Sequence, residues 1–201
     1  MATTTGMIRE IDVHRMPSQD LAALLSVSSA LASTLDLPSI LQTAITGACD
    51  VMGLDTGAIY LLSDSTLVLH ATTPQLPTSF PDEYRNAPLD EHPHIGTCLT
   101  SGEPVWVADA ASEPMTSAER GGCSIRSLRS ILYVPLAVDM GPVGAFILGS
   151  TCGGKHWERT DIDLSRTLAH QISLAVSNAR LHESLVEANC NSDVKLFLCL
   201  S

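Results

Sequence analysis

Apolar positions in the first quarter of the chain recur with helical spacing. Between residues 18 and 35 a seam returns at alternating steps of three and four, at Leu21, Leu24, Ser28, Leu31 and Leu35. This seam predicts an amphipathic helix that is able to pair with another helix. Asp36 and Pro38 then supply a cap and an early proline for a second helix, which we expect to end at Gly53. Its buried face is predicted at Ile40, Leu41, Ala44, Ile45 and Ala48.

Two later pairs of apolar segments predict β-hairpins. Residues 57–62 and 66–71 flank a short polar turn, and residues 131–138 and 143–150 flank the turn-forming tetrapeptide 139–142. These strands are apolar at most consecutive positions instead of alternating with polar ones. The pattern therefore predicts an antiparallel sheet that is covered on both faces.

The segment between the hairpins is rich in proline and polar residues from 72 to 93, and we expect a long loop there that covers a pocket. A short helix is predicted at 95–101, ended by Gly102, followed by a strand at 104–108 and a second short helix within 115–128. Thr160 and Asp163 form a capping-box-like start to a long final helix, which is expected to reach about residue 188.

Composition and charge narrow the choice of partners. With 201 residues, 45% of them hydrophobic, the chain is expected to form one core. The formal net charge is −11 and the lysines are Lys155 and Lys195, so we expect neither nucleic acid nor an anionic membrane as a partner. The N-terminal sequence does not resemble a signal peptide, and no apolar run approaches the roughly 20 residues that span a bilayer. We therefore predict a cytoplasmic location.

Cysteine and histidine side chains are the candidates for metal or redox chemistry in this chain. The six cysteines lie far apart, without a CxxC pair or a histidine at ligand spacing, which argues against zinc and iron–sulfur sites and favours reduced thiols: Cys49, Cys98, Cys123, Cys152, Cys190 and Cys199. A compact cluster joins Asp90, Glu91, His92 and His94. Metal binding and pH sensing are two interpretations of this cluster, and a solvated loop is the third.

Several stretches resemble the GAF family in its order and spacing, over roughly residues 20–186. They read LLSVSSALASTLDLPSILQTAI, GAIYLL, TSGEPVWVAD, LRSILYVPL, GPVGAFILGS and AHQISLAVSNARLHESL. The resemblance implies an α+β fold related to PAS domains, with a six-stranded antiparallel sheet. It implies terminal helices on one face and, on the other, a small-molecule pocket covered by a loop and short helices. On this basis we expect a flexible segment at 1–17, a GAF domain at 18–188 and a tail at 189–201.

The chemistries known in the family find little support among these residues. The Asn-Lys-Phe-Asp-Glu set of cyclic-nucleotide binders is absent, since residues 153–163 read GGKHWERTDID. Bilin binders commonly have a Cys followed by His, but here Ser follows Cys123, and residues 115–130 contain no haem-ligating His. The family's methionine sulfoxide reductases would place a Cys immediately before Gly96, where this chain has Ile95. The ligand and any cofactor are left open, and no metal site or catalytic residue is assigned.

For a pocket of the family type we predict six ligand-binding residues: Tyr60, His94, Cys98, Arg129, Ser130 and Tyr133. Arg129 would hold an anionic group through its planar donors, and the tyrosines would supply apolar walls with a hydroxyl tip. Each residue also has a structural interpretation. The tyrosines suit a sheet core, and Arg129 suits a surface ion pair.

We interpret the chain as a sensory, ligand-binding module of signal transduction that is not an enzyme. The resemblance implies a homodimer joined through its terminal helices, which relay ligand occupancy to an output domain or partner such as the histidine kinase of a two-component system. One alternative is a purely structural dimerisation domain without a ligand. A second is a thiol-dependent reductase of free methionine sulfoxide.

Overall fold

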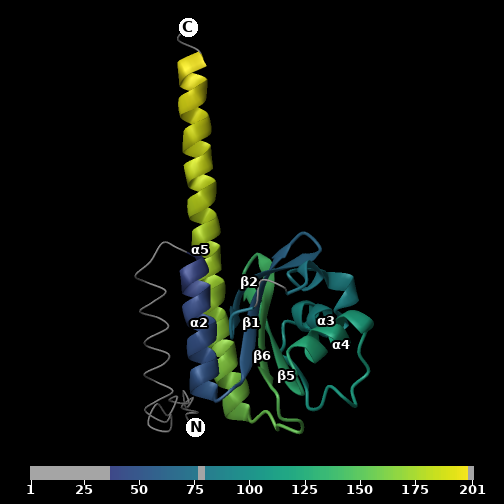
Figure 1. The fold of residues 1–201 in the computed structure, drawn as a ribbon. Helices are drawn as coiled ribbons and strands as arrows, with labels where there is room; N and C mark the ends of the chain where they lie inside the picture. Colours follow the sequence, from purple (N-terminus) through teal and green to yellow (C-terminus); the bar gives the residue numbers. More distant parts are fainter. Residues whose placement is uncertain (1–36, 77–79, 199–201) are drawn as a thin grey trace, which may run out of the picture.

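The computed structural model describes residues 37–76 and 80–198, which form an open six-stranded antiparallel sheet between two helical layers (Figure 1). The strand order across the sheet is β3-β2-β1-β6-β5-β4. The predicted α+β architecture is confirmed. The helix expected at 18–35 and the segment expected at 1–17 lie outside the described residues.

The strands are β1 Thr56–Ser63, β2 Thr66–Thr73, β3 Asn86–Pro88, β4 Val105–Val107, β5 Ser130–Val138 and β6 Gly141–Ser150. The helices are α2 Leu37–Met52, α3 Pro93–Ser101, α4 Ser117–Ile125 and α5 Arg159–Leu198, with 3-10 turns η2 Asp82–Tyr84 and η3 Leu89–Glu91. No helix within the described ranges is both long and apolar enough to span a bilayer.

Both predicted hairpins are present, as β1–β2 and β5–β6. The turn of the second hairpin is shorter than predicted, because Gly141 already pairs with Val138 and leaves only two residues between the strands. Pro142 lies opposite Ala137, beside an irregularity of the ladder. A proline is tolerated near the start of a strand and at a bulge, so it does not have to belong to the turn.

The segment from 72 to 93 is not one continuous loop, so this prediction was wrong in part. Strand β2 continues to Thr73, and β3 then adds an edge strand to the sheet through antiparallel pairing with β2. Strand β3 has three residues and ends at Pro88, which is acceptable at an edge because no ladder hydrogen bond is lost there. Three residues are too few to give an alternation that sequence analysis would detect.

Alternate residues of β5 enter two different hydrophobic cores. Leu132 and Val134 pack in the core that α2 and α5 cover. Ile131 and Tyr133 pack in the opposite core, with side chains of α3 and α4. The uninterrupted apolar run in the sequence therefore reflects a strand that is buried on both faces.

Helices α2 and α5 lie side by side on one face of the sheet, while α3 and α4 cover the other (Figure 1). Leu41 and Ile45 of α2 and Ile172 of α5 are completely buried in this layer. Helix α5 has 40 residues, and Figure 1 shows it continuing well past the sheet. The fold thus connects a covered sheet to a long projecting rod.

The start of α5 differs from the prediction. The helix begins at Arg159, so Thr160 lies within its first turn and does not cap it. The Glu158 backbone N–H donates to Oδ2 of Asp161 at 3.2 Å. The capping box predicted for Thr160 and Asp163 is therefore wrong. The carboxylate that caps the helix belongs to Asp161.

Candidate ligand pocket

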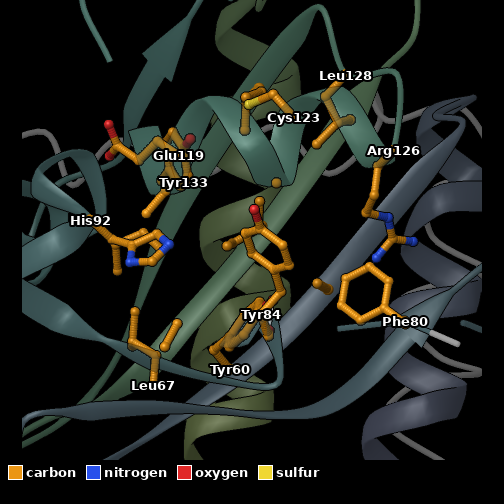
Figure 2. Close-up of a pocket in the computed structure, with 17 residues that line it drawn as sticks. Tyr60, Leu67, Phe80, Tyr84, His92, Glu119, Cys123, Arg126, Leu128 and Tyr133 are labelled. Atoms are coloured by element: carbon orange, nitrogen blue, oxygen red, sulfur yellow. Dashed lines mark hydrogen bonds between the residues drawn. The ribbon is translucent and has the colours of Figure 1, made fainter. Parts of the chain in front are cut away.

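A cavity of about 90 Å³ lies between the sheet and the short helices α3 and α4 (Figure 2). Strands β1, β5 and β6 form one wall, α4 forms the opposite wall, and most of the lining is apolar. The residues with polar groups in the lining are Tyr60, Tyr84, His92, Glu119, Arg126 and Tyr133. Since one water needs about 10–15 Å³ of such space, the cavity has room for several waters or one small organic molecule.

Tyr84 of η2 crosses the cavity and ends against α4 (Figure 2). A β-carbon added at Gly121 would overlap the Tyr84 hydroxyl oxygen, so the missing side chain allows the ring to reach the helix. The Tyr60 hydroxyl donates to the Tyr84 backbone carbonyl at 2.8 Å. Burial raises the pKa of Tyr60 to about 12, so this hydroxyl keeps its proton at neutral pH. Together these contacts hold the η2 segment over the cavity.

Glu119 ties the two short helices together. Its Oε1 accepts hydrogen bonds from the His94 backbone N–H at 3.0 Å and lies 2.9 Å from the His94 Nδ1. Its Oε2 accepts from the Thr116 backbone N–H at 3.3 Å, while the Thr116 hydroxyl accepts from the Glu119 N–H at 3.1 Å. Thr116 and Glu119 thus form a capping box at the start of α4 that also fixes the start of α3.

Arg126 closes the opposite end of the cavity, where α4 ends. Its Nη1 donates to the Thr72 hydroxyl, and its Nη2 donates to the backbone carbonyls of Thr73 at 3.0 Å and Pro74 at 3.4 Å. All three acceptors are uncharged. Burial lowers the pKa of Arg126, but an arginine remains protonated in proteins. A half-buried positive charge therefore lies at the wall of an otherwise apolar cavity.

The sequence also matches the model of a known domain family. The model of the GAF domain matches residues 34–177, which is more than half of the chain. The chain belongs to the GAF domain family. None of the curated protein sequences matches this GAF domain.

Solved structures share the fold of this GAF domain. The GAF domain of an Acinetobacter phosphoenolpyruvate-protein phosphotransferase is 19% identical, with a TM-score of 0.69 over 84% of this chain and 99% of that one. The free methionine-R-sulfoxide reductase of Neisseria meningitidis, solved with its substrate, is 20% identical, with a TM-score of 0.66 over 83% and 95%. The GAF domain of the cyanobacteriochrome TePixJ is 18% identical, with a TM-score of 0.62 over 75% and 95%. At these identities the likeness establishes the fold alone.

The structure brings only part of the predicted residue set to the cavity. Tyr60 and Tyr133 line it, whereas His94 lies behind its wall, stacked on Tyr133 at 5.9 Å between ring centroids and bound to Glu119. Cys98 is completely buried in the apolar core of this face and does not line the cavity.

Two further predicted residues lie away from the cavity. Arg129 pairs with Asp109, with Nε and Oδ1 2.9 Å apart and Nη2 and Oδ2 3.0 Å apart. Of the two interpretations of Arg129 given above, this contact agrees with the surface ion pair. Ser130 is fully buried, and its hydroxyl lies 3.1 Å from the Cys152 carbonyl, which fixes the start of β5.

Several lining residues were not among the six predicted ligand contacts, namely Tyr84, His92, Glu119 and Arg126, of which His92 was named only in the Asp90–His94 cluster. For Glu119 a signal existed, because the T-x-x-E spacing from Thr116 is a capping-box pattern. For Arg126 the sequence contains no such signal. Whether a single arginine near the end of a short helix faces the cavity or the solvent depends on the residue at which the helix ends.

The Asp90–His94 cluster does not form a metal centre. Asp90 and Glu91 are exposed, while the two histidines bind other partners: Nδ1 of His92 lies 3.0 Å from the Pro88 carbonyl, and His94 binds Glu119. Within residues 37–76 and 80–198, no group of three or more His, Cys, Asp or Glu side chains is arranged to hold a metal ion.

Proposed function

We propose that this GAF domain is a sensory module of signal transduction: a small molecule binds in the cavity, and α5 relays its occupancy to an output domain or partner. Tyr60 and Tyr133 are the ligand contacts retained from the sequence, and Glu119, His92 and Arg126 join them. The two-sided burial of β5 is the observation that carries this proposal. The cytoplasmic location remains a prediction from the sequence, which shows neither a signal-peptide pattern nor an apolar run long enough to span a bilayer.

The relay follows from the geometry of β5. Ile131 and Tyr133 line the cavity, while Leu132 and Val134 lie in the core beneath α2 and α5. A ligand that shifts the first pair must move the same backbone that supports the second pair. Because packed cores have few voids, a small shift of the strand is transmitted to the helix that rests on it.

Exposed leucines on α5 support dimerisation through this helix. Leu174 has 43% and Leu181 61% of its surface exposed, and they are seven residues apart. Seven residues are close to two helical turns, so both side chains lie along one stripe of the helix. We propose that a second copy of the chain covers this stripe, with the two α5 helices paired.

Native mass spectrometry of the full chain under reducing conditions tests both parts of the proposal. We expect a dimer that carries a discrete additional mass, and a monomer for the double variant Leu174→Glu/Leu181→Glu. Met140→Glu is the matched control, since Met140 is 96% exposed at the tip of the β5–β6 hairpin, and it should remain dimeric. A monomeric wild-type protein would contradict the paired-helix relay, and a dimer that never carries or accepts a small molecule would favour a structural module.

The thiol chemistry gives little support to the reductase alternative. A reactive cysteine requires a lowered pKa and access to its substrate. Burial raises the pKa of Cys98 to about 12 and that of Cys123 to about 11, where Glu119 adds to the effect. Both thiols are therefore protonated at neutral pH, and we propose that neither is a catalytic nucleophile.

A further inference from the structure

We propose that the ligand of this pocket is a small organic carboxylate whose charged end is held at Arg126. The inference rests on the proposed function, because it assigns a chemical class to the ligand of the same cavity. It starts from the charges in the lining. Arg126 is the only arginine or lysine among the described residues that line the cavity, and Glu119 is the only carboxylate.

Among the described residues, Arg126 has hydrogen-bond donors to spare and no negatively charged partner. A guanidinium has five N–H groups, and the three hydrogen bonds to Thr72, Thr73 and Pro74 leave two of them without an acceptor within the described residues. No described carboxylate forms an ion pair with Arg126, in contrast to Arg129. A half-buried cation without a counter-charge is costly, and a ligand carboxylate would supply that charge through strong charge-assisted hydrogen bonds.

Glu119 does not oppose the binding of an anion at Arg126. Its two oxygens are engaged by His94 and Thr116. Figure 2 shows Glu119 and Arg126 at opposite sides of the cavity, with Tyr84 between them. The carboxylate of Glu119 therefore already has its hydrogen-bond partners, whereas the guanidinium of Arg126 still lacks a negatively charged one.

The far end of the cavity offers a matching pair of polar atoms. Tyr133 is 4% exposed, and within the described residues its hydroxyl makes no hydrogen bond. The His92 Nδ1 lies 3.0 Å from the Pro88 carbonyl, which only accepts, so this nitrogen carries the proton and a neutral ring has an acceptor at Nε2. Figure 2 shows the His92 ring turned toward the cavity. A ligand held at Arg126 has to extend past the Tyr84 ring to reach this end, where its hydroxyl would accept from Tyr133 and donate to His92.

The space between the two ends favours a compact carboxylate over a phosphate ester or nucleotide. Ala58, Leu67 and Ile147 supply apolar surface along this wall, which suits a hydrocarbon body. A phosphate carries up to two negative charges, and the lining offers a single cation to meet them. A volume of about 90 Å³ also limits the ligand to a small acid.

Calorimetric titration of the full chain with matched acids and amides tests this inference. The probes are 4-hydroxybutanoate, 4-hydroxybenzoate and 4-hydroxyphenylacetate, each beside its neutral amide, which has nearly the same shape. We expect at least one acid to bind, and its amide to bind with an affinity lower by about tenfold or more. The reason is that charge-assisted hydrogen bonds are about twice as strong as neutral ones. Arg126→Gln should weaken binding of the acid by at least about tenfold, and the matched variant Arg129→Gln should leave it unchanged.

The other outcomes separate this inference from the proposed function. Equal binding of acid and amide, or unchanged affinity in Arg126→Gln, would overturn the carboxylate assignment and leave a small-molecule pocket standing. Binding of none of the three acids would also overturn it. Tyr133→Phe keeps the ring and provides a test that does not depend on the folding of Arg126→Gln. This variant should weaken the binding of an acid that carries the hydroxyl. It should leave the binding of the deoxy analogue, such as benzoate, unchanged.

Discussion

The hydroxyl of Tyr60, on the central strand β1, donates a hydrogen bond to the backbone carbonyl of Tyr84 at 2.8 Å. This contact joins the wall of the cavity to the η2 segment that crosses it. Tyr84 in turn reaches α4 at Gly121, so one short chain of contacts links the sheet, the covering segment and the helix opposite. The covering segment is thus held by a few identifiable atoms.

Removal of this hydrogen bond should loosen the covering segment. We expect Tyr60→Phe to lower the free energy of unfolding by about 1 kcal/mol, the usual net value of one hydrogen bond, because the Tyr84 carbonyl loses its donor. Amide hydrogen exchange should become faster at residues 82–92. Tyr133→Phe is the matched control, since its hydroxyl makes no hydrogen bond within the described residues. An equal loss in both variants would contradict the role assigned to the Tyr60 hydroxyl.

The carboxylate of Glu119 should be important for the stability of the α3–α4 layer. Glu119→Gln keeps the size of the side chain but places an amide donor where only acceptors fit, so urea denaturation should show a loss of about 1–3 kcal/mol. Glu113 also approaches His94, at 3.9 Å, but its side chain is 44% exposed. Glu113→Gln should therefore change the free energy of unfolding by less than about 0.5 kcal/mol. A milder effect in Glu119→Gln than in Glu113→Gln would refute this assignment.

Asp55 makes part of the folding stability depend on pH in the acidic range. Its Oδ2 accepts hydrogen bonds from the Thr151 backbone N–H at 2.8 Å and the Ser150 hydroxyl at 2.9 Å, and these lower its pKa below the ordinary value of 3.8. A lowered pKa means that the folded state holds the ionised form more firmly than the unfolded state does. The stabilisation by Asp55 is therefore complete at a pH above its pKa in the unfolded state. It is lost as the pH falls through its pKa in the folded state.

Thermal melts across pH measure this contribution. The stability difference between wild type and Asp55→Asn should be constant from about pH 5 to 7 and should shrink below about pH 4. Asp139→Asn, which changes a carboxylate at the exposed β5–β6 turn, is the matched control. A difference between wild type and Asp55→Asn that grows as the pH falls would have the wrong sign for this explanation.

The described thiols should differ strongly in reactivity. Cys152 is exposed, whereas Cys49, Cys98 and Cys123 are buried. Burial raises the pKa of Cys49 to about 12, with Asp50 adding to the effect. Iodoacetamide at pH 7.5, followed by peptide mass spectrometry, should modify Cys152 in the folded protein and the other three only after denaturation. Rapid labelling of Cys98 or Cys123 in the folded protein would instead support the alternative of a thiol-dependent methionine sulfoxide reductase.

Much of the fold follows from the sequence because its signals are local. The hairpin turns, the early Pro38 of α2 and the closing glycines are visible in short stretches, and Gly53 and Gly102 have the positive φ values of 60° and 69° that helix ends favour. Strand β3 is not visible in this way. It forms because β2 offers an unpaired edge, which is a property of the assembled sheet.

The candidate site was predictable only in part, for a related reason. Arg126 and Arg129 are three residues apart, and the sequence alone does not indicate which one faces the cavity. The end of α4 at Ile125 decides the question, because it places Arg126 at the cavity and leaves Arg129 on the surface beside Asp109. The two tyrosines were easier to place, since each lies on a strand whose alternation fixes the face of the sheet.

The alternation along β5 also has a consequence for how such a domain diversifies. Ile131 and Tyr133 contact the cavity, while Leu132 and Val134 contact the core below α2 and α5. Substitutions at the first pair therefore change the side chains of the cavity directly, and they reach the layer beneath α2 and α5 only through the shared backbone of β5. One strand thus carries the side chains of both layers at alternate positions, so residues that face the cavity can be exchanged while those beneath the helices stay the same.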